Sequence, residues 1–281
     1  MEKYKKIREL GEGGFGTAYL VERISDGVQF VIKEINVIGQ TESELNSIED
    51  EAIKMINLRQ LNVVKYEDHW FDGKNPPEKL AIVMEYCSSG DLSDKIREAQ
   101  GCFFHERKII GWFEQMCAAI KQCHDRQIIH RDLKAENFFL TMDGTRIKLG
   151  DFGVAKVLEN STSGGIRNAR TLAGTLTHIA PEMYEGEYDT KVDIWSLGVC
   201  LYHLCNLELP FIPEAGADNL TVQSQISVKV QNLDYKPLQG HYSQRMKDIV
   251  AKCLQIDPTM RPDIDELQEM VDALKFELHK S

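Results

Sequence analysis

The chain has 281 residues, a formal net charge of −11 and a pI of about 5.3. This acidic balance argues against nucleic acid or an anionic membrane as the main partner. Hydrophobic residues make up 42% of the chain and charged residues 27%, which is typical of a globular protein with a sizeable core in one or two domains.

Cysteine usage and the absence of apolar runs bear on the compartment. The seven cysteines are scattered and form no C-x-x-C pair, which favours a reducing compartment, cytoplasmic or nuclear. The first residues, MEKYKK, are charged and do not read as a signal peptide, and no apolar run approaches membrane-spanning length. We therefore expect a soluble intracellular protein with no membrane segment.

The first motif is LGEGGFGTAYLV, which places Gly11, Gly13 and Gly16 at the G-x-G-x-x-G spacing. This spacing also occurs in dinucleotide-binding loops, which open a helix, and in plain hairpin turns. Here residues 17–23 read as a second strand, and a turn leads into a third strand at 28–36. The pattern therefore predicts a glycine hairpin lying over phosphates, with backbone that can approach them because it carries no Cβ.

The third predicted strand contains FVIKEIN, which brings Lys33 to the position that grips phosphates in such a hairpin. Residues 42–59 follow, with apolar residues at helical spacing. Glu51 lies on this predicted helix and can pair with Lys33. Taken singly, the two residues are more often solvated surface charges, so their meaning depends on the motifs further along.

The pattern changes near EYCSSGD, from strands plus one helix before it to helices after it. We expect an α+β chain, a single domain over 1–281, with a small antiparallel sheet lobe at 1–86 and a larger, mainly helical lobe at 87–281. The helices of the second lobe are predicted at 104–126, 191–207, 243–254 and 263–278, and the helix at 191–207 is apolar nearly all round, as expected of a buried helix. Residues 159–168, rich in Ser, Thr and Gly, are expected to be mobile.

Two motifs in the middle of the chain carry the candidate chemistry, HRDLKAEN and GDFG. Asp132 can accept a proton from a substrate hydroxyl, while Asn137 and Asp151 can offer oxygen to Mg²⁺. Asp-Phe-Gly alone is usually a simple turn, but the longer motif rarely arises by chance. With the glycine hairpin and Lys33 before them, the motifs match the order of parts that phosphoryl transfer from ATP requires.

These residues resemble eukaryotic protein kinases across essentially the whole chain. The segments VIKEIN, IVMEYCSSGDL, NFFLTMDGTRIKLGDFGVAKVL and RTLAGT are similar to the NIMA-related kinases. Lys134 is the serine/threonine-type signature, and APE at 180–182 with Arg261 resembles the family's structural ion pair. The resemblance implies the bilobal protein-kinase fold and transfer of the γ-phosphate of ATP to serine and threonine hydroxyls of protein substrates.

The resemblance also implies roles for individual residues with ATP and Mg²⁺. Asp132 would orient the acceptor hydroxyl, Lys134 would steady the γ-phosphate, and Thr175 would hydrogen-bond the catalytic loop. Lys33, held by Glu51, would grip the α- and β-phosphates. The remaining cofactor-binding residues would be Gly11, Gly13, Gly16, Ala18, Val31, Met84 as gatekeeper, the backbone of Glu85 and Cys87, Asp91, and Phe139 as the floor of the adenine pocket; Asn137 and Asp151 would bind the metal.

Regulation is expected at Thr171, which lies where family members carry their activating phosphate. Thr171 would be phosphorylated by an upstream kinase or by autophosphorylation, and Arg131, joined by Lys156, would hold the phosphate. The alternative is that Thr171 is an ordinary loop threonine without a regulatory role, with the serines and threonine at 161–163 as competing phosphorylation sites. The sequence does not indicate the oligomeric state.

Four further residues bear on the choice of phosphate acceptor. Val154 follows Asp-Phe-Gly and, being β-branched, predicts that threonine is used at least as well as serine. Asp91 and Glu136 stand where basophilic kinases place carboxylates, which predicts a moderate preference for arginine before the acceptor. Asp91 is nearly as well explained by capping a helix or meeting the ribose. His203 replaces a third acidic residue, so the preference should be weaker than in strongly basophilic kinases.

Departures from the family pattern keep two alternatives open. Ala18 stands where a valine usually roofs the adenine, and Val31 replaces the more general alanine, a roughly volume-conserving exchange. Leu176-Thr177-His178 replaces the usual Pro-Tyr-Tyr, so the preference after the acceptor cannot be carried over. The alternatives are a pseudokinase that acts as a binding module and a small-molecule phosphotransferase; Lys134 and APE weigh against the second.

Overall fold

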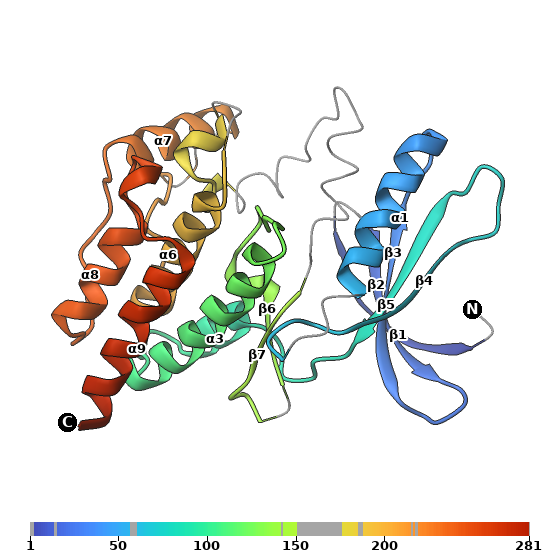
Figure 1. The fold of residues 1–281 in the computed structure, drawn as a ribbon, viewed down its shortest axis with the longest axis horizontal. Coiled ribbons are helices and arrows are strands. Elements are labelled where there is room, and N and C mark those ends of the chain that lie inside the picture. The colour runs from blue at the N-terminus through green and yellow to red at the C-terminus, as the bar shows by residue number, and fades with distance from the viewer. Residues whose placement is uncertain are drawn as a thin grey trace. The chain divides into compact units, whose positions relative to one another are not determined.

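The structure, a computed structural model, describes residues 3–13, 16–56, 61–141, 143–150, 176–184, 188–214, 216 and 219–280. They divide into two compact units: the described residues up to Ser88, together with Gly150, form the first, and the others form the second. The architecture is α+β, as predicted, with a sheet and one helix in the first unit and mainly helices in the second (Figure 1).

The first unit is built on a five-stranded antiparallel sheet in the order β1-β2-β3-β5-β4. Its helix, α1, lies in the connection between β3 and β4 (Figure 1). The elements are β1 (Tyr4–Gly13), β2 (Gly16–Arg23), β3 (Gln29–Asn36), α1 (Glu42–Ile56), β4 (Tyr66–Phe71) and β5 (Lys79–Glu85). The two strands and the helix predicted after the glycine motif are confirmed to within a few residues.

The sheet has two faces, because successive side chains of a strand point to opposite sides. Along β3, Phe30 and Ile32 point to one face, where they form a buried cluster with Val21, Ala81 and Val83. Tyr4, Tyr19 and Trp70 cover this cluster. The residues that alternate with Phe30 and Ile32 along β3, including Lys33, therefore point to the opposite face.

The position of α1 follows from the strand register. His69 pairs with Ile82, and Ile82 pairs with Lys33, so the three side chains share one face of the sheet. The His69 ring nitrogen Nε2 lies 3.4 Å from the Glu49 carboxylate of α1. The helix therefore packs over the face that carries Lys33.

The second unit consists of helices around α6, with a two-stranded hairpin. The elements are α2 (Leu92–Glu98), α3 (Glu106–His124), β6 (Phe138–Leu140), β7 (Ile147–Leu149), α6 (Lys191–Asn206), α7 (Asn219–Gln231), α8 (Gln244–Cys253) and α9 (Ile264–Lys280), with short 3₁₀ turns at Ala135–Asn137, Pro181–Tyr184 and Pro258–Met260. Helix α3 packs on α9, and α6 on α8 (Figure 1).

Helix α6 is the core of the second unit. Nearly all its residues are buried, which confirms the buried helix predicted at 191–207. It ends where Leu207 takes a left-handed backbone conformation, with φ of 59°. Helix α7 was not predicted, because its apolar residues do not gather on one face and Val228 among them is exposed. Within the described ranges, no helix is long and apolar enough to cross a membrane.

Candidate active site

The glycine motif lies in a hairpin between β1 and β2. Gly11 pairs with Ala18, and Gly13 pairs with Gly16. Gly16 has a φ of +143°, and a Cβ built on it would lie 1.9 Å from the carbonyl oxygen of Glu34. No side chain fits there, because the neighbouring strand β3 occupies the space that a Cβ would need. The third glycine of the motif is therefore required by the sheet as well as by the predicted approach to phosphates.

Four of the predicted cofactor-binding side chains share one face of the first unit. Ala18 pairs with Lys33 and Val31 pairs with Met84, and directly opposite residues of antiparallel strands point to the same side. Val31 and Lys33 alternate along β3 and therefore point together as well. Met84 is buried and the other three are half-buried. The register thus brings the predicted adenine-contacting and phosphate-gripping residues to the sheet face beneath α1.

Three other predicted residues belong to this unit. Glu51 lies in α1, which covers the Lys33 face, but its side chain is outside the described part of the structure, so the Lys33–Glu51 pair stays a prediction. The Glu85 amide donates to the Lys65 carbonyl at 2.9 Å, and the Glu85 carboxylate accepts from the Lys65 amide at 2.7 Å. Cys87 is half-buried and forms no disulfide. Glu85 is therefore fixed where β5 ends.

In the second unit, the predicted catalytic residues of HRDLKAEN converge. The Lys134 ammonium lies 3.1 Å from the Asp132 carboxylate. The Asn137 amide nitrogen donates to the Asp132 carbonyl at 2.6 Å and lies 3.4 Å from the Asp132 carboxylate. Asp132 is 26% exposed, whereas Asn137 is buried. One carboxylate thus remains open to a substrate while a cation and an amide hold it in place.

The orientation of Asn137 bears on metal binding. Its nitrogen is turned to the Asp132 carbonyl, which fixes the amide oxygen as the atom that can meet a cation. An amide oxygen is a hard donor of the kind that Mg²⁺ prefers, whereas Asp151, the second predicted ligand, lies outside the described ranges. Among the residues that the structure describes, no group of three or more His, Cys, Asp and Glu forms a ready metal site.

The residue that shapes this loop was not predicted. Asp193, in the first turn of α6, is fully buried and accepts three hydrogen bonds, each at 2.9 Å. They come from the His124 ring and from the backbone amides of His130 and Arg131. Burial would raise the pKa of Asp193, but the hydrogen bond and charge of His124, the charge of His130 and the Arg131 amide together hold it below its usual range. The only sequence signal was an acidic residue at the start of a helix that is otherwise apolar.

Asp91 and Phe139, both predicted at the cofactor site, lie side by side in this unit. They form an isolated antiparallel bridge, and the Leu140 amide donates to the Gly90 carbonyl at 2.8 Å. Asp91 also caps α2, where its carboxylate accepts from the Asp94 amide at 2.9 Å. Burial raises the pKa of Asp91, and the charges of Asp94 and Glu136 add to the rise. The helix-capping alternative considered for Asp91 is therefore realised.

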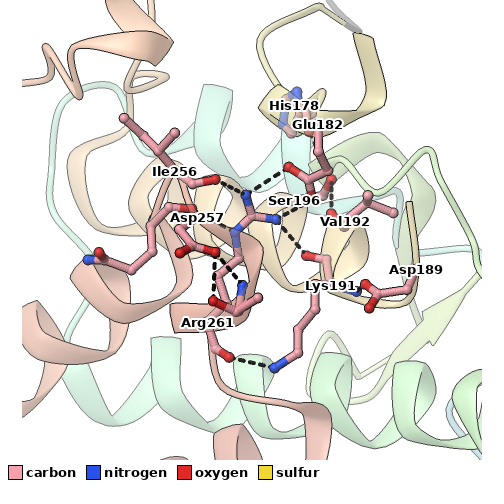
Figure 2. A network of polar contacts seen from close by, with 11 residues as sticks. His178, Glu182, Asp189, Lys191, Val192, Ser196, Ile256, Asp257 and Arg261 are labelled. Atoms are coloured by element: carbon pink, nitrogen blue, oxygen red, sulfur yellow. Dashed lines mark hydrogen bonds and ion pairs between the residues drawn. The ribbon is translucent and has the colours of Figure 1, made fainter. Parts of the chain in front are cut away.

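The predicted structural ion pair is confirmed, and Figure 2 shows its surroundings. The Arg261 guanidinium binds both oxygens of the Glu182 carboxylate, at 2.6 and 2.9 Å. It also donates to three backbone carbonyls, at 2.7 to 3.1 Å, and it lies over the Trp195 ring; those carbonyls belong to Gln255, Ile256 and Lys191. The segment around 182 is thus bound to the core helix from which Asp193 reaches the catalytic loop.

Several predicted residues lie outside the described ranges. They are Asp151, Val154, Lys156, Thr171 and Thr175, together with the segment 159–168 that was expected to be mobile. Of the Leu176-Thr177-His178 departure, all three residues are buried, and the Thr177 hydroxyl lies 3.0 Å from the His178 ring nitrogen. The Ser196 hydroxyl of α6 donates to the His178 carbonyl at 2.8 Å. The three side chains that depart from the family pattern are therefore packed inside the second unit.

Comparison with known proteins gives the same family as the motifs. Residues 4–271 match the family model described as the protein kinase domain. The chain is 39% identical over 270 residues to the serine/threonine-protein kinase Nek1 of Mus musculus, covering 96% of this chain and 21% of that protein. It is 38% identical over 268 residues to Nek5 of Homo sapiens, covering 95% of this chain and 36% of the relative.

A third relative is the probable serine/threonine-protein kinase nek3 of Dictyostelium discoideum. It is 38% identical over 276 residues, covering 96% of this chain and 23% of that protein. The chain therefore spans between about a fifth and about a third of the length of these relatives. Because the family model covers nearly the whole chain, the chain belongs to the protein kinase family, within its NIMA-related (Nek) group.

Proposed function

We propose that this chain is a protein serine/threonine kinase that transfers the γ-phosphate of ATP to hydroxyl groups of protein substrates. The observation that carries the proposal is the cluster in which Lys134 and Asn137 lie within 3.4 Å of the Asp132 carboxylate. Phosphoryl transfer depends on positioning and charge neutralisation more than on covalent chemistry. A partly exposed carboxylate, held between an ammonium group and an amide, suits that requirement.

The proposed chemistry at the acceptor falls to Asp132. Its carboxylate accepts a hydrogen bond from the serine or threonine hydroxyl and turns the oxygen toward the γ-phosphate. Lys134 neutralises negative charge that gathers on the transferred group. The backbone on either side is fixed by Asp193 through the His130 and Arg131 amides, so the carboxylate keeps its place during the transfer.

The proposed nucleotide site uses the Lys33 face of the first unit. Lys33 grips the phosphates, with Glu51 as its partner, while Ala18, Val31 and Met84 supply an apolar surface for adenine. The Gly11–Gly16 hairpin brings backbone N–H groups to the phosphates. Asn137 and Asp151 would hold Mg²⁺, which would neutralise the negative charge of the phosphates. Glu85, Cys87, Asp91 and Phe139 complete the proposed binding set.

The proposed regulation is phosphorylation of Thr171, by an upstream kinase or by the chain itself. Arg131 supports this part, because it precedes Asp132 directly and can transmit the binding of a phosphate to the catalytic carboxylate. Lys156 is the proposed second cation. All seven cysteines lie in the described ranges and none forms a disulfide, which favours an intracellular site of action, cytoplasmic or nuclear.

The test is transfer of labelled phosphate from ATP to a generic basic protein in the presence of Mg²⁺. We expect activity in the wild-type chain and a loss of at least about 100-fold in Asp132→Asn and in Lys33→Met. Both variants should melt close to the wild-type temperature, because neither side chain belongs to the core.

Asp234→Asn and Lys236→Met are matched controls, since both residues lie in exposed ion pairs away from the proposed site. They should leave activity unchanged. A wild-type chain that binds ATP without transferring phosphate would instead identify a pseudokinase. Transfer only to small metabolites would identify a small-molecule phosphotransferase.

A further inference from the structure

Arg131 has a backbone conformation that is unusual for a residue with a side chain. Its φ is +67°, in the left-handed region that favours glycine. Its amide donates to the buried Asp193 carboxylate at 2.9 Å, so the conformation is held by a contact with the core helix α6. A residue kept in such a conformation directs its side chain where an extended or helical residue would not, and such positions cluster at functional sites.

The side chain of Arg131 is held by a separate contact, with an aromatic ring. Its guanidinium carbon lies 5.4 Å from the centre of the Tyr188 ring, within the distance of about 6 Å at which a cation is attracted to an aromatic face. Tyr188 is half-buried and lies just before α6. The segment 188–193 therefore holds Arg131 twice, with Asp193 at the backbone and Tyr188 at the guanidinium.

The segment that carries Tyr188 is itself fixed. The Asp189 carboxylate accepts from the Lys191 amide at 2.8 Å, and the Lys191 ammonium donates to the Arg261 carbonyl at 2.6 Å. Figure 2 shows Asp189 and Lys191 joined in this way to the Arg261–Glu182 network. The ring thus stands on a part of the chain that is bound to one of the most buried side chains of the unit.

We infer that Tyr188 is a positioning residue, which holds the Arg131 guanidinium ready to receive an anionic group such as a phosphothreonine. The five N–H donors of a guanidinium lie in its own plane, so a guanidinium held near a ring can still offer two of them to two phosphate oxygens. Because Arg131 precedes Asp132 directly in the chain, a fixed Arg131 side chain also restricts the backbone that positions the Asp132 carboxylate. This inference rests on the proposed kinase activity.

The experiment is a double-mutant cycle between Tyr188 and Arg131, read as kcat and as KM for ATP. Tyr188→Leu removes the ring and should lower kcat about fivefold, the effect of losing one cation–aromatic contact, with little change in KM. Tyr188→Phe keeps the ring and should stay within about twofold of wild type. In an Arg131→Ala background, Tyr188→Leu should cause no further loss.

A second readout separates positioning from general structure. Each enzyme is incubated with ATP and Mg²⁺, and kcat is compared before and after treatment with a phosphatase. The ratio of kcat before phosphatase treatment to kcat after it should exceed one for wild type and Tyr188→Phe, and should fall toward one for Tyr188→Leu. Phe276→Leu is the matched control, because Phe276 is exposed and lies under the Lys280 ammonium at 4.1 Å, far along the chain from the catalytic loop; its ratio should equal that of wild type.

Three results overturn the inference. The first is a loss of kcat from Tyr188→Leu that is equal with and without the Arg131 side chain. The second is a loss of kcat in Tyr188→Phe as large as in Tyr188→Leu. The third is a wild-type kcat that phosphatase treatment leaves unchanged. Should Tyr188→Leu fail to fold, Tyr188→Met takes its place and is read in the same way. A wild-type chain without any transfer rejects the proposed function and this role with it, whereas additive losses in an active enzyme reject this role alone.

Discussion

The Asp193 carboxylate accepts the backbone N–H of Arg131 at 2.9 Å, and this bond joins the most buried helix of the second unit to the loop that carries Asp132. Asp193 is fully buried and is held ionised by the His124 ring and two backbone amides. A buried charge is tolerated only when it is paired and hydrogen-bonded. The chain keeps one here because the loop has no regular structure of its own to fix it.

The first prediction concerns Gly16. Gly16→Ala should destabilise the chain by at least about 2 kcal/mol and raise KM for ATP, because its Cβ would overlap the Glu34 carbonyl. Gly27→Ala is the matched control: its φ is also positive, at 71°, but a Cβ there meets nothing within 4 Å. The control should cost about 1 kcal/mol and leave KM unchanged. Urea unfolding and ATP titration measure the two effects, and equal costs at the two sites would contradict the clash.

The second prediction concerns Glu34, which is 6% exposed and joins β1, β3 and β5. Its carboxylate accepts from the Lys6 ammonium at 2.7 Å and from the Lys79 ammonium at 3.0 Å. Glu34→Gln should cost about 1–3 kcal/mol of unfolding free energy at neutral pH. The control, Glu78→Gln, removes an exposed pair with Lys74 and should cost less than about 1 kcal/mol.

The pH dependence of this effect has a definite sign. Burial would raise the pKa of Glu34, but the two lysines hold it below the ordinary value of 4.5. The stabilisation is therefore complete above pH 4.5 and is lost as the pH falls through the lower pKa of the folded state. Unfolding free energies of wild type and Glu34→Gln should converge in acid. A difference that stays constant as the pH is lowered would show that the charge of Glu34 is not what stabilises the sheet.

The third prediction concerns the pair in Figure 2. Arg261→Lys keeps the positive charge but loses the two parallel bonds to Glu182 and most of the bonds to backbone carbonyls. We expect a cost of about 3–5 kcal/mol, because the backbone carbonyls around the fully buried Arg261 side chain lose their donors and the mostly buried Glu182 carboxylate loses its matched partner. Arg245→Lys, in an ion pair with Glu277 in which both side chains are half exposed, should change stability by less than about 1 kcal/mol. Thermal melting of the two variants side by side makes the comparison.

Motifs predicted the parts of this molecule that sequence spacing encodes directly. The G-x-G-x-x-G spacing and the run after it indicated two strands and a hairpin, which β1, β2 and β3 confirm. The adjacency of Asp132, Lys134 and Asn137 was likewise implicit in eight consecutive residues. A short motif brings its own side chains together, so no long-range contact has to be inferred.

The contacts that support the site could not be found in the same way. Asp193 reaches His130 across 63 positions of chain, and Tyr188 meets Arg131 across a comparable stretch. Neither residue type signals its partner, because an acidic residue at a helix start is usually a simple electrostatic match to the helix end. Similarly, α7 lacks an apolar stripe, so periodicity alone gave no indication of it.

The last prediction concerns substrate preference and rests on the proposed kinase activity. Asp91 and Glu136 were the two carboxylates expected to favour arginine before the acceptor. The structure gives the two carboxylates different surroundings. Asp91 caps α2 through the Asp94 amide, whereas Glu136 is exposed. The pKa of Asp91 is also raised, by burial and by its acidic neighbours. Asp91 is thus already engaged within the unit, and Glu136 is the better candidate for meeting a guanidinium.

We therefore expect Glu136→Ala to remove most of the advantage of arginine two or three residues before the acceptor. The advantage itself should be about fivefold in kcat/KM at low salt, as befits a partly exposed ion pair of about 1 kcal/mol, and it should shrink as salt is added. Asp91→Asn, which keeps a cap on α2, should leave most of it in place. The measurement is kcat/KM for paired peptides with arginine or alanine at those positions, at two salt concentrations. If Asp91→Asn removes the advantage and Glu136→Ala does not, the capping carboxylate is the one that meets the substrate, and the assignment to Glu136 is wrong.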